Sequence, residues 1–119
     1  MTAKEVAYEV TRVLDEKKGM DIKVLKIDKI SSLADYFIIC TGTSNTHVRT
    51  LCDYAEETFE RLGEPMLGRE GHRGNTWELL DFGSVVVHVF TDEAREFYAL
   101  ERLWADAQQI DLSQIVTVE

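Results

Sequence analysis

The sequence has a single proline, seven glycines and only two cysteines among its 119 residues. So few chain-breaking residues leave no stretch with the composition of a flexible linker, and this length is close to the commonest size of one domain. Cys40 and Cys52 lack the short spacing of a zinc site and are too few for a disulfide framework. We therefore expect one compact domain without a structural metal or disulfide bridge.

Long hydrophobic runs are also missing. No apolar stretch approaches the roughly 18 residues of a membrane-spanning helix. The N-terminus, which starts at Met1, has neither the apolar core and cleavage site of a secretory signal nor a transit segment. These features predict a cytoplasmic protein that does not associate with membranes.

Positive charge is scarce, since 13 Lys and Arg residues stand against 22 Asp and Glu residues and give a formal net charge of −9. A protein that binds nucleic acid directly must neutralise phosphates with Lys and Arg. We therefore expect no sequence-specific binding to nucleic acid. The charge permits attraction to a basic protein, although solubility alone would explain it equally well.

The N-terminal third predicts a helix followed by two strands. Thr2 and Glu5 fit a capping box, and apolar residues then recur at helical intervals up to Gly19, which we expect to take the left-handed conformation that ends the helix. Residues 22–28 mix β-branched residues with lysines, as in a half-exposed strand. Residues 36–41 are continuously apolar, as expected of a strand covered on both faces near the sheet centre.

The rest of the chain predicts three more strands and two more helices. The strands are expected at residues 66–70, 77–81 and 85–90, the last two joined as a hairpin. Ser44 or Asn45 is suited to cap one helix, which crosses from the central strand to the third strand, and the other begins at Asp92. The order α-β-β-α-β-β-β-α implies a single α/β domain, a mixed sheet of about five strands packed with helices.

The loop Thr41–Asn45, between a predicted strand and a predicted helix, is the first candidate for chemistry. A glycine, hydroxyl groups and a helix N-terminus could together bind a phosphate, which would favour a nucleotidyltransferase-like enzyme. The loop has no lysine and no Walker-type pattern of glycines. Gly42 as a turn residue and Ser44 as a helix cap explain the same residues, and the nucleotide-binding alternative stays open.

Paired carboxylates for a two-metal enzyme are not evident, because alternation along a strand requires acids at i and i+2. Glu78 and Asp81 are three apart and would point to opposite faces of their strand. Asp92 and Glu93 suit the first turn of a helix, where acids complement the helix dipole. We therefore expect no catalytic residue, no metal site and no cofactor.

His88 lies in an apolar strand and shares a face with Val86 and Phe90, which is typical of a structural histidine. A dyad of His88 with Cys40 would require their strands to adjoin. The sequence offers neither an oxyanion hole nor a group to orient such a dyad, and this also favours a protein without catalysis.

Large aromatic residues among acids suggest a binding surface instead. Trp77, Tyr98 and Trp104 each carry a polar atom that requires a partner, and acids surround the latter two in the sequence. Aromatic anchors rimmed by charge are typical of the energetic centres of protein–protein interfaces. For each aromatic taken separately, filling the core is an equally good explanation.

Three long motifs are more specific than any of these short patterns. They read DYFIICTGTSNTHV at residues 35–48, VVVHVF at residues 85–90 and AREFYALERLW at residues 94–104. In sequence and in order they resemble the Iojap proteins, the ribosomal silencing factors. The likeness runs from about Glu5 to Asp106, so we expect an Iojap-like ribosomal silencing domain at residues 1–106 and a C-terminal tail, loose or extended, at residues 107–119.

The resemblance implies a nucleotidyltransferase-like α/β fold that has lost its catalytic acids. It also implies binding to the large ribosomal subunit through its ribosomal protein numbered fourteen, on the face that meets the small subunit. Occupation of that face would block subunit joining by steric exclusion and repress translation when nutrients are scarce. Members of the family are often homodimers when free, so we expect the same here.

We expect the contact with the ribosomal protein to combine aromatic and apolar side chains with acids at the periphery. The predicted contact residues are Trp77, Leu79, Tyr98, Glu101 and Trp104, with Glu70 and Asp106 as peripheral charges. The acidic balance of the chain would speed the encounter with a basic partner. The same residues could instead belong to the core or to a dimer interface.

Overall fold

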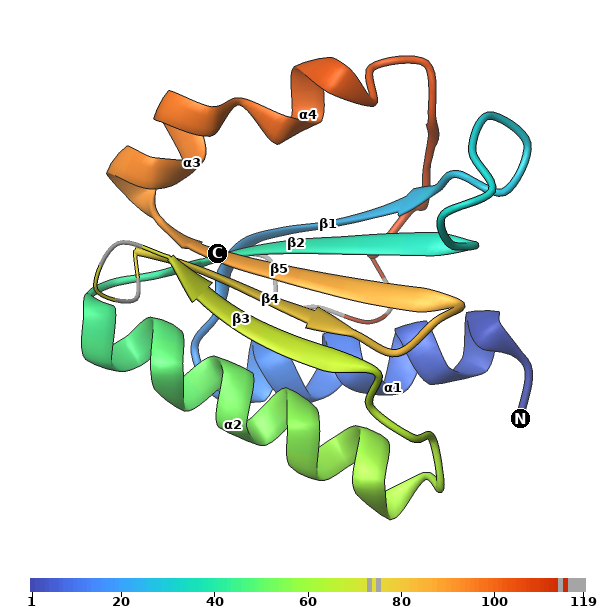
Figure 1. The fold of residues 1–119 in the computed structure, drawn as a ribbon, viewed down its shortest axis with the longest axis horizontal. Helices are drawn as coiled ribbons and strands as arrows, with labels where there is room; N and C mark the ends of the chain where they lie inside the picture. The colour runs from blue at the N-terminus through green and yellow to red at the C-terminus, as the bar shows by residue number, and fades with distance from the viewer. Residues whose placement is uncertain (73, 75, 114, 116–119) are drawn as a thin grey trace.

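The computed structural model describes residues 1–119 apart from residues 73, 75, 114 and 116–119 (Figure 1). Within the described residues a single sheet lies between two layers of helices. The elements in chain order are α1 (Ala3–Glu16), β1 (Met20–Lys26), β2 (Tyr36–Gly42), α2 (Asn45–Arg61), β3 (Gly68–His72), β4 (Trp77–Asp81), β5 (Val85–Thr91), α3 (Asp92–Tyr98), α4 (Leu100–Leu103) and β6 (Gln108–Gln109).

The sheet is mixed, with the strand order β3-β4-β5-β2-β1-β6. β2 and β5 run parallel at its centre, and the other neighbouring pairs are antiparallel. Every residue of β2 is buried, which confirms the prediction of a strand covered on both faces. The predicted hairpin of β4 and β5 and the crossover through α2 to β3 are also confirmed.

The described part of the chain contains one strand more than the expected five or so. The additional strand, β6, pairs with the outer edge of β1. The backbone N–H of Ile110 continues this pairing by donating to the carbonyl of Val24 at 2.9 Å, and Leu112 beyond it is buried against the α1 side of the sheet.

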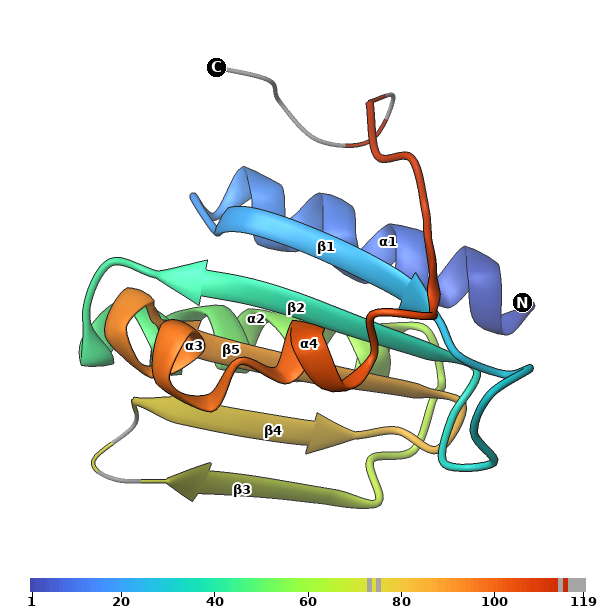
Figure 2. The same ribbon diagram turned by 90° about the horizontal axis from the view of Figure 1, so that it is seen from above.

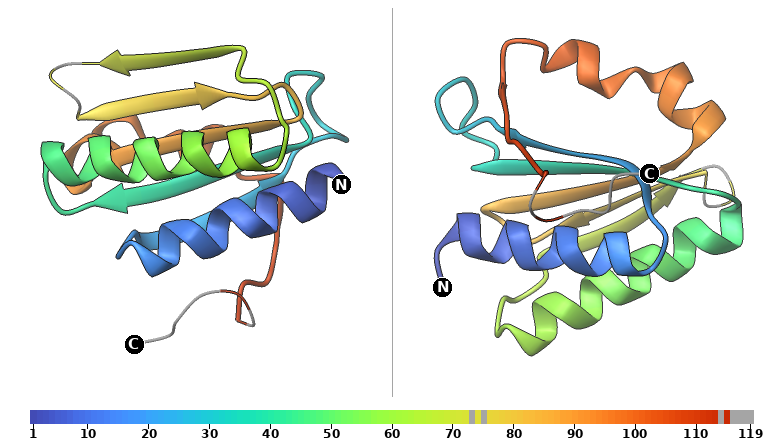
Figure 3. Two further views of the ribbon diagram at one scale, coloured as in Figure 1. Left: turned by 90° about the horizontal axis from the view of Figure 1, so that it is seen from below. Right: turned by 180° about the vertical axis from the view of Figure 1, so that it is seen from behind.

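The two faces of the sheet carry separate apolar clusters because side chains alternate along each strand. Val85, Val87 and Val89 of β5 face α1 and α2, which cross this side of the sheet in Figure 3. Val86 and Phe90 face the opposite side, which α3 and α4 partly cover. The predicted division of β5 into two faces is therefore confirmed.

The first helix begins as predicted. The Glu5 backbone N–H donates to the Thr2 hydroxyl at 3.1 Å, and the Thr2 backbone N–H donates to the Glu5 carboxylate at 2.9 Å, which completes the capping box. The predicted end is wrong, because Lys18 and not Gly19 takes the left-handed conformation, with φ 71°. Gly19 is required for a different reason, since a Cβ there would lie 2.6 Å from the Cys40 sulfur.

The helix predicted from Asp92 is divided in two. Ala99 adopts a left-handed conformation, with φ 48° and ψ 43°, and separates α3 from α4. Because the chain turns here, Phe97 and Leu103 point to solvent, with 73% and 76% of their surface exposed. The start of a helix at Asp92 is confirmed, and the break at Ala99 was not predicted. Among the described helices, none is long and apolar enough to cross a membrane.

Candidate functional site

The predicted aromatic and apolar contact residues meet on the α3–α4 side of the sheet. Trp77 and Leu79 project from β4 on this side, and Tyr98 and Trp104 reach it from the end of α3 and from the turn after α4. All four are half-buried and pack against the apolar cluster around Phe37. We call the surface formed by Trp77, Leu79, Tyr98 and Trp104 the aromatic face.

Trp77 is held on several sides. Its ring stacks on Phe90, the cross-strand neighbour in β5, with centroids 5.1 Å apart and an interplanar angle of 21°. Tyr98 packs on it with centroids 4.6 Å apart. The indole N–H donates to Nδ1 of His88 at 3.3 Å. These contacts fix the ring at the surface of the sheet.

Trp104 occupies the other end of the aromatic face. Its ring meets Phe37 of β2 edge to face, with centroids 5.1 Å apart and an interplanar angle of 85°. Such edge-to-face pairs are the favoured geometry of aromatic rings. Trp104 therefore completes the packing over β2 and still presents part of its surface.

Glu101 is engaged within the chain. Its carboxylate accepts hydrogen bonds from Arg95 Nε and from Lys23 Nζ, both at 2.7 Å. The hydrogen bond from Arg95, followed by that from Lys23, lowers the pKa of Glu101 against the opposite effect of burial. The structure thus assigns Glu101 a role in anchoring α4, and its contact with a partner stays a prediction.

The two peripheral acids lie at different edges. Glu70 of β3 is exposed and directly opposite Leu79 in the register of β3 and β4, so its side chain is on the aromatic-face side of the sheet. Asp106 is exposed in the turn that follows Trp104. Both positions fit a charged rim, although neither residue is part of the apolar cluster.

Sequence reasoning missed residues that border the aromatic face. Phe97, whose ring contacts that of Tyr98, and Leu103, next to Trp104 in the chain, are the most exposed large apolar side chains of the described residues. His88 was identified as structural, but its hydrogen bond to Trp77 was not. Trp77 and His88 are diagonal neighbours across the two strands of the predicted hairpin, and this placement could have indicated their hydrogen bond.

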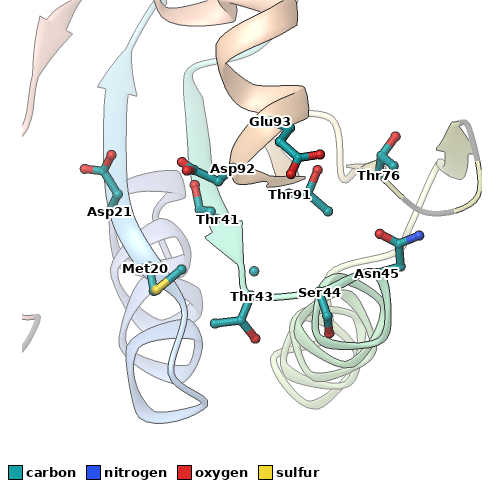
Figure 4. A pocket seen from close by; sticks show the side chains of 11 residues that line it. Met20, Asp21, Thr41, Thr43, Ser44, Asn45, Thr76, Thr91, Asp92 and Glu93 are labelled. Carbon is teal, nitrogen blue, oxygen red and sulfur yellow. The ribbon is translucent and has the colours of Figure 1, made fainter.

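The loop Thr41–Asn45 borders a cavity of about 550 Å³ at the carboxyl ends of β2 and β5. Figure 4 shows the side chains that line it, among them the carboxylates of Asp21, Asp92 and Glu93. In the part of the chain that the structure describes, no group of three or more His, Cys, Asp or Glu residues is arranged to hold a metal ion.

The contacts of this loop are those of a helix start. The Ser44 hydroxyl accepts from the His47 backbone N–H at 3.1 Å, which confirms Ser44 as the cap of α2. The Thr43 backbone N–H donates to His47 Nδ1 at 2.8 Å, so His47 Nε2 carries the proton and donates to the Lys17 carbonyl at 2.9 Å. A Cβ on Gly42 would lie 2.9 Å from the Val48 backbone nitrogen. Packing alone therefore requires glycine at position 42.

The dyad of Cys40 and His88 is ruled out by geometry. The two residues lie on the neighbouring strands β2 and β5, where His88 is opposite Ile39 and Cys40 is opposite Val89. Cys40 nevertheless belongs to the cluster on the α1–α2 side, whereas His88 contacts Phe37 and Trp77 on the other side. Burial also raises the pKa of the Cys40 thiol to about 12, which opposes formation of a thiolate.

Known proteins resemble this chain over most of its length. The family model described as "Ribosomal silencing factor during starvation" matches residues 1–119. The ribosomal silencing factor RsfS of Bacillus subtilis is 37% identical over 112 residues, covering 94% of this chain and 95% of that protein. The mouse protein "Mitochondrial assembly of ribosomal large subunit protein 1" is 34% identical over 95 residues, covering 77% of this chain and 42% of its own length.

The fold has solved counterparts as well. A crystal structure of a Chromobacterium violaceum protein superposes with a TM-score of 0.85 at 34% sequence identity, covering 95% of this chain and 93% of that chain. The family model spans the whole chain, and the sequence motifs, the α/β fold and the relatives agree with it. This protein therefore belongs to the ribosomal silencing factor family, which includes the Iojap proteins.

Proposed function

We propose that this protein binds the large ribosomal subunit through the ribosomal protein numbered fourteen and blocks joining of the small subunit by occupying the joining face. The aromatic face is the proposed contact. Glu101, Glu70 and Asp106 are its proposed charged surroundings. Translation is repressed because the occupied subunit cannot enter a complete ribosome.

The observation that carries this proposal is the incomplete cover of one side of the sheet. Figure 2 shows α3 and α4 over β5 and β2, and none of the described helices lies over β3 and β4 on that side. Trp77 and Leu79 of β4 lie in this region and are only half-buried. Half-buried aromatic and apolar side chains on a flat surface are suited to be the desolvated centre of a protein interface.

The net charge of the chain and its similarity to a known relative support the large ribosomal subunit as the partner. The net charge of −9 favours encounter with a basic ribosomal protein. The name of the mouse relative attributes to that protein a part in assembly of the ribosomal large subunit. We extend the large-subunit association to this chain, which acts in the cytoplasm and is a homodimer when free.

Sedimentation of purified subunits tests the proposal. Added protein is expected to sediment with large subunits and to deplete the joined ribosome peak at moderate salt. Trp77→Ala should weaken co-sedimentation by about tenfold or more, the range of an interface hot spot. Tyr54→Ala is the matched control, because Tyr54 is a half-buried aromatic residue on α2, on the other side of the sheet.

The same experiment has a clear negative outcome. If small subunits still join normally at saturating protein, steric exclusion is refuted. If Tyr54→Ala weakens binding and Trp77→Ala does not, the contact lies on the α1–α2 side instead of the aromatic face. Sedimentation equilibrium of the free protein tests the homodimer.

The alternative function is nucleotide binding at the loop Thr41–Asn45, for which the adjoining cavity is the supporting observation. The carboxylates of Asp21, Asp92 and Glu93 line the same cavity and would repel phosphates. Calorimetry with ATP and magnesium distinguishes the two functions. Measurable heat of binding would favour the enzyme, and we expect none.

A further inference from the structure

His88 is the polar residue buried beneath the aromatic face. Only 4% of its surface is exposed. Its ring packs edge to face against Phe37, with centroids 5.0 Å apart, and Nδ1 receives the Trp77 indole N–H at 3.3 Å. A polar ring buried among aromatic side chains costs stability unless it is hydrogen-bonded, so the bond from Trp77 is a contact that offsets the cost of burying His88.

The hydrogen bond determines the protonation state of the His88 ring. An indole N–H can only donate, so Nδ1 of His88 must be the unprotonated acceptor and Nε2 must carry the proton. Among the described residues, Nε2 has no hydrogen-bond partner. The His88 ring thus accepts a hydrogen bond from Trp77 through Nδ1, whereas its own N–H at Nε2 has no partner among the described residues. This difference indicates that His88 is present to supply the acceptor for Trp77.

We propose that His88 is a positioning residue that fixes the indole of Trp77 in the orientation required for contact with the partner, an inference that rests on the proposed function. Phe90 and Tyr98 pack against the indole ring of Trp77. His88 restrains rotation of the same ring, because it accepts the hydrogen bond of the indole N–H. Trp77 is thereby ordered before the partner arrives, which lowers the entropy lost on binding.

The same bond determines the chemistry of the partner's surface. When a tryptophan is buried at an interface, its N–H needs an acceptor, and a partner normally has to supply one. Here His88 supplies it from within the chain. The surface that covers Trp77 can therefore be apolar, formed by aliphatic side chains, without leaving a donor unsatisfied.

Nuclear magnetic resonance tests the positioning role in the free protein. The chain has only two tryptophans, so a ¹⁵N-labelled sample gives one indole signal from Trp77 and one from Trp104 as an internal control. His88→Leu removes the acceptor and should shift the Trp77 indole proton upfield and speed its exchange with water. His88→Gln keeps an acceptor and should preserve most of the shift, and in both variants the backbone spectrum reports on folding.

Binding to purified large subunits tests whether the positioning matters for function. His88→Leu should weaken binding about tenfold, the equivalent of roughly 1.4 kcal/mol, and His88→Gln less than threefold. In the Trp77→Phe background, which has an aromatic ring but no N–H donor, His88→Leu should change affinity less than twofold. This coupling separates an effect through Trp77 from a general loss of stability.

An unmoved Trp77 signal in His88→Leu would overturn the inference, as would an equal loss of affinity in both backgrounds. It would also be overturned if Trp77→Ala weakens binding and His88→Leu does not, which leaves the proposed function intact. If neither Trp77→Ala nor His88→Leu alters binding, the aromatic face is not the contact, and the proposed function and the inference fail together.

Discussion

The guanidinium of Arg95 and the carboxylate of Glu101 form an ion pair across the break between α3 and α4, with Nε and Oε1 2.7 Å apart. Arg95 is only 7% exposed. Its Nη1 also donates to the Asp21 carbonyl at 2.6 Å and to the Thr41 hydroxyl at 2.8 Å. One buried side chain therefore fastens the α3–α4 segment, and with it half of the aromatic face, to β1 and β2.

Arg95→Ala should lower the free energy of unfolding by about 2 kcal/mol, because it leaves the Glu101 carboxylate and two acceptors without their buried donor. Urea denaturation measures the change. Arg102→Ala is the matched control, since Arg102 is an exposed arginine of α4, and it should alter stability by less than about 0.5 kcal/mol. Equal effects of the two variants would contradict the anchoring role.

Ala99→Gly should raise the free energy of unfolding by about 0.5 kcal/mol. A left-handed conformation costs an alanine more than the additional chain entropy that a glycine loses on folding, and Ala99 has φ 48°. Thermal denaturation measures the shift. Ala105→Gly, at an exposed turn position without a positive φ, should give no increase. A clear destabilisation by Ala99→Gly would show that the Ala99 methyl group contributes more through packing than the strain costs.

Acidification should destabilise the protein through His88. Burial lowers its pKa from 6.5 to about 4, so between these values the unfolded chain binds a proton that the folded chain does not. The contribution of the neutral His88 ring to the free energy of unfolding is fully present above pH 6.5 and is lost as the pH falls toward 4. From pH 7.5 to pH 5.5 the free energy of unfolding should drop by about 1.4 kcal/mol from this group.

Urea denaturation at the two pH values measures this drop, and the His88→Gln variant provides the comparison because glutamine does not titrate. The carboxylates with lowered pKa, such as Glu101, lose their contribution only at lower pH. An identical pH dependence in the variant would mean that His88 is not the group responsible.

Gly19→Ala should destabilise the fold by about 2 kcal/mol. The new Cβ would lie 2.6 Å from the Cys40 sulfur and 2.8 Å from the Leu14 carbonyl oxygen, and such overpacking forces the backbone to move. Gly68→Ala is the control, since a Cβ there meets nothing within 4 Å and no positive φ is needed. Circular dichroism during urea titration compares the two variants, and similar stabilities would contradict the close approach of β2 to the end of α1.

Features that depend on neighbouring residues could be predicted from the sequence. The capping box of Thr2 and Glu5, the Ser44 cap and the alternation of β5 were predicted and are present. The burial of β2 also followed from its unbroken apolar run. Each of these results from local hydrogen bonding or from a short apolar pattern, and such signals are readable along the chain. The long motifs identified the family, which the matching family model confirms.

The contacts between distant segments could not be predicted from the sequence and are seen in the folded chain. Gly19, between α1 and β1, is required by the close approach of Cys40 in β2. The left-handed Ala99 lies between α3 and α4, which Arg95 and Glu101 join across the break. The hydrogen bond from Trp77 to His88 depends on the register of β4 and β5. These arrangements are set by packing between elements that are far apart in sequence. Such packing overrides local conformational preferences, and it cannot be predicted from the periodicity of residues along one element.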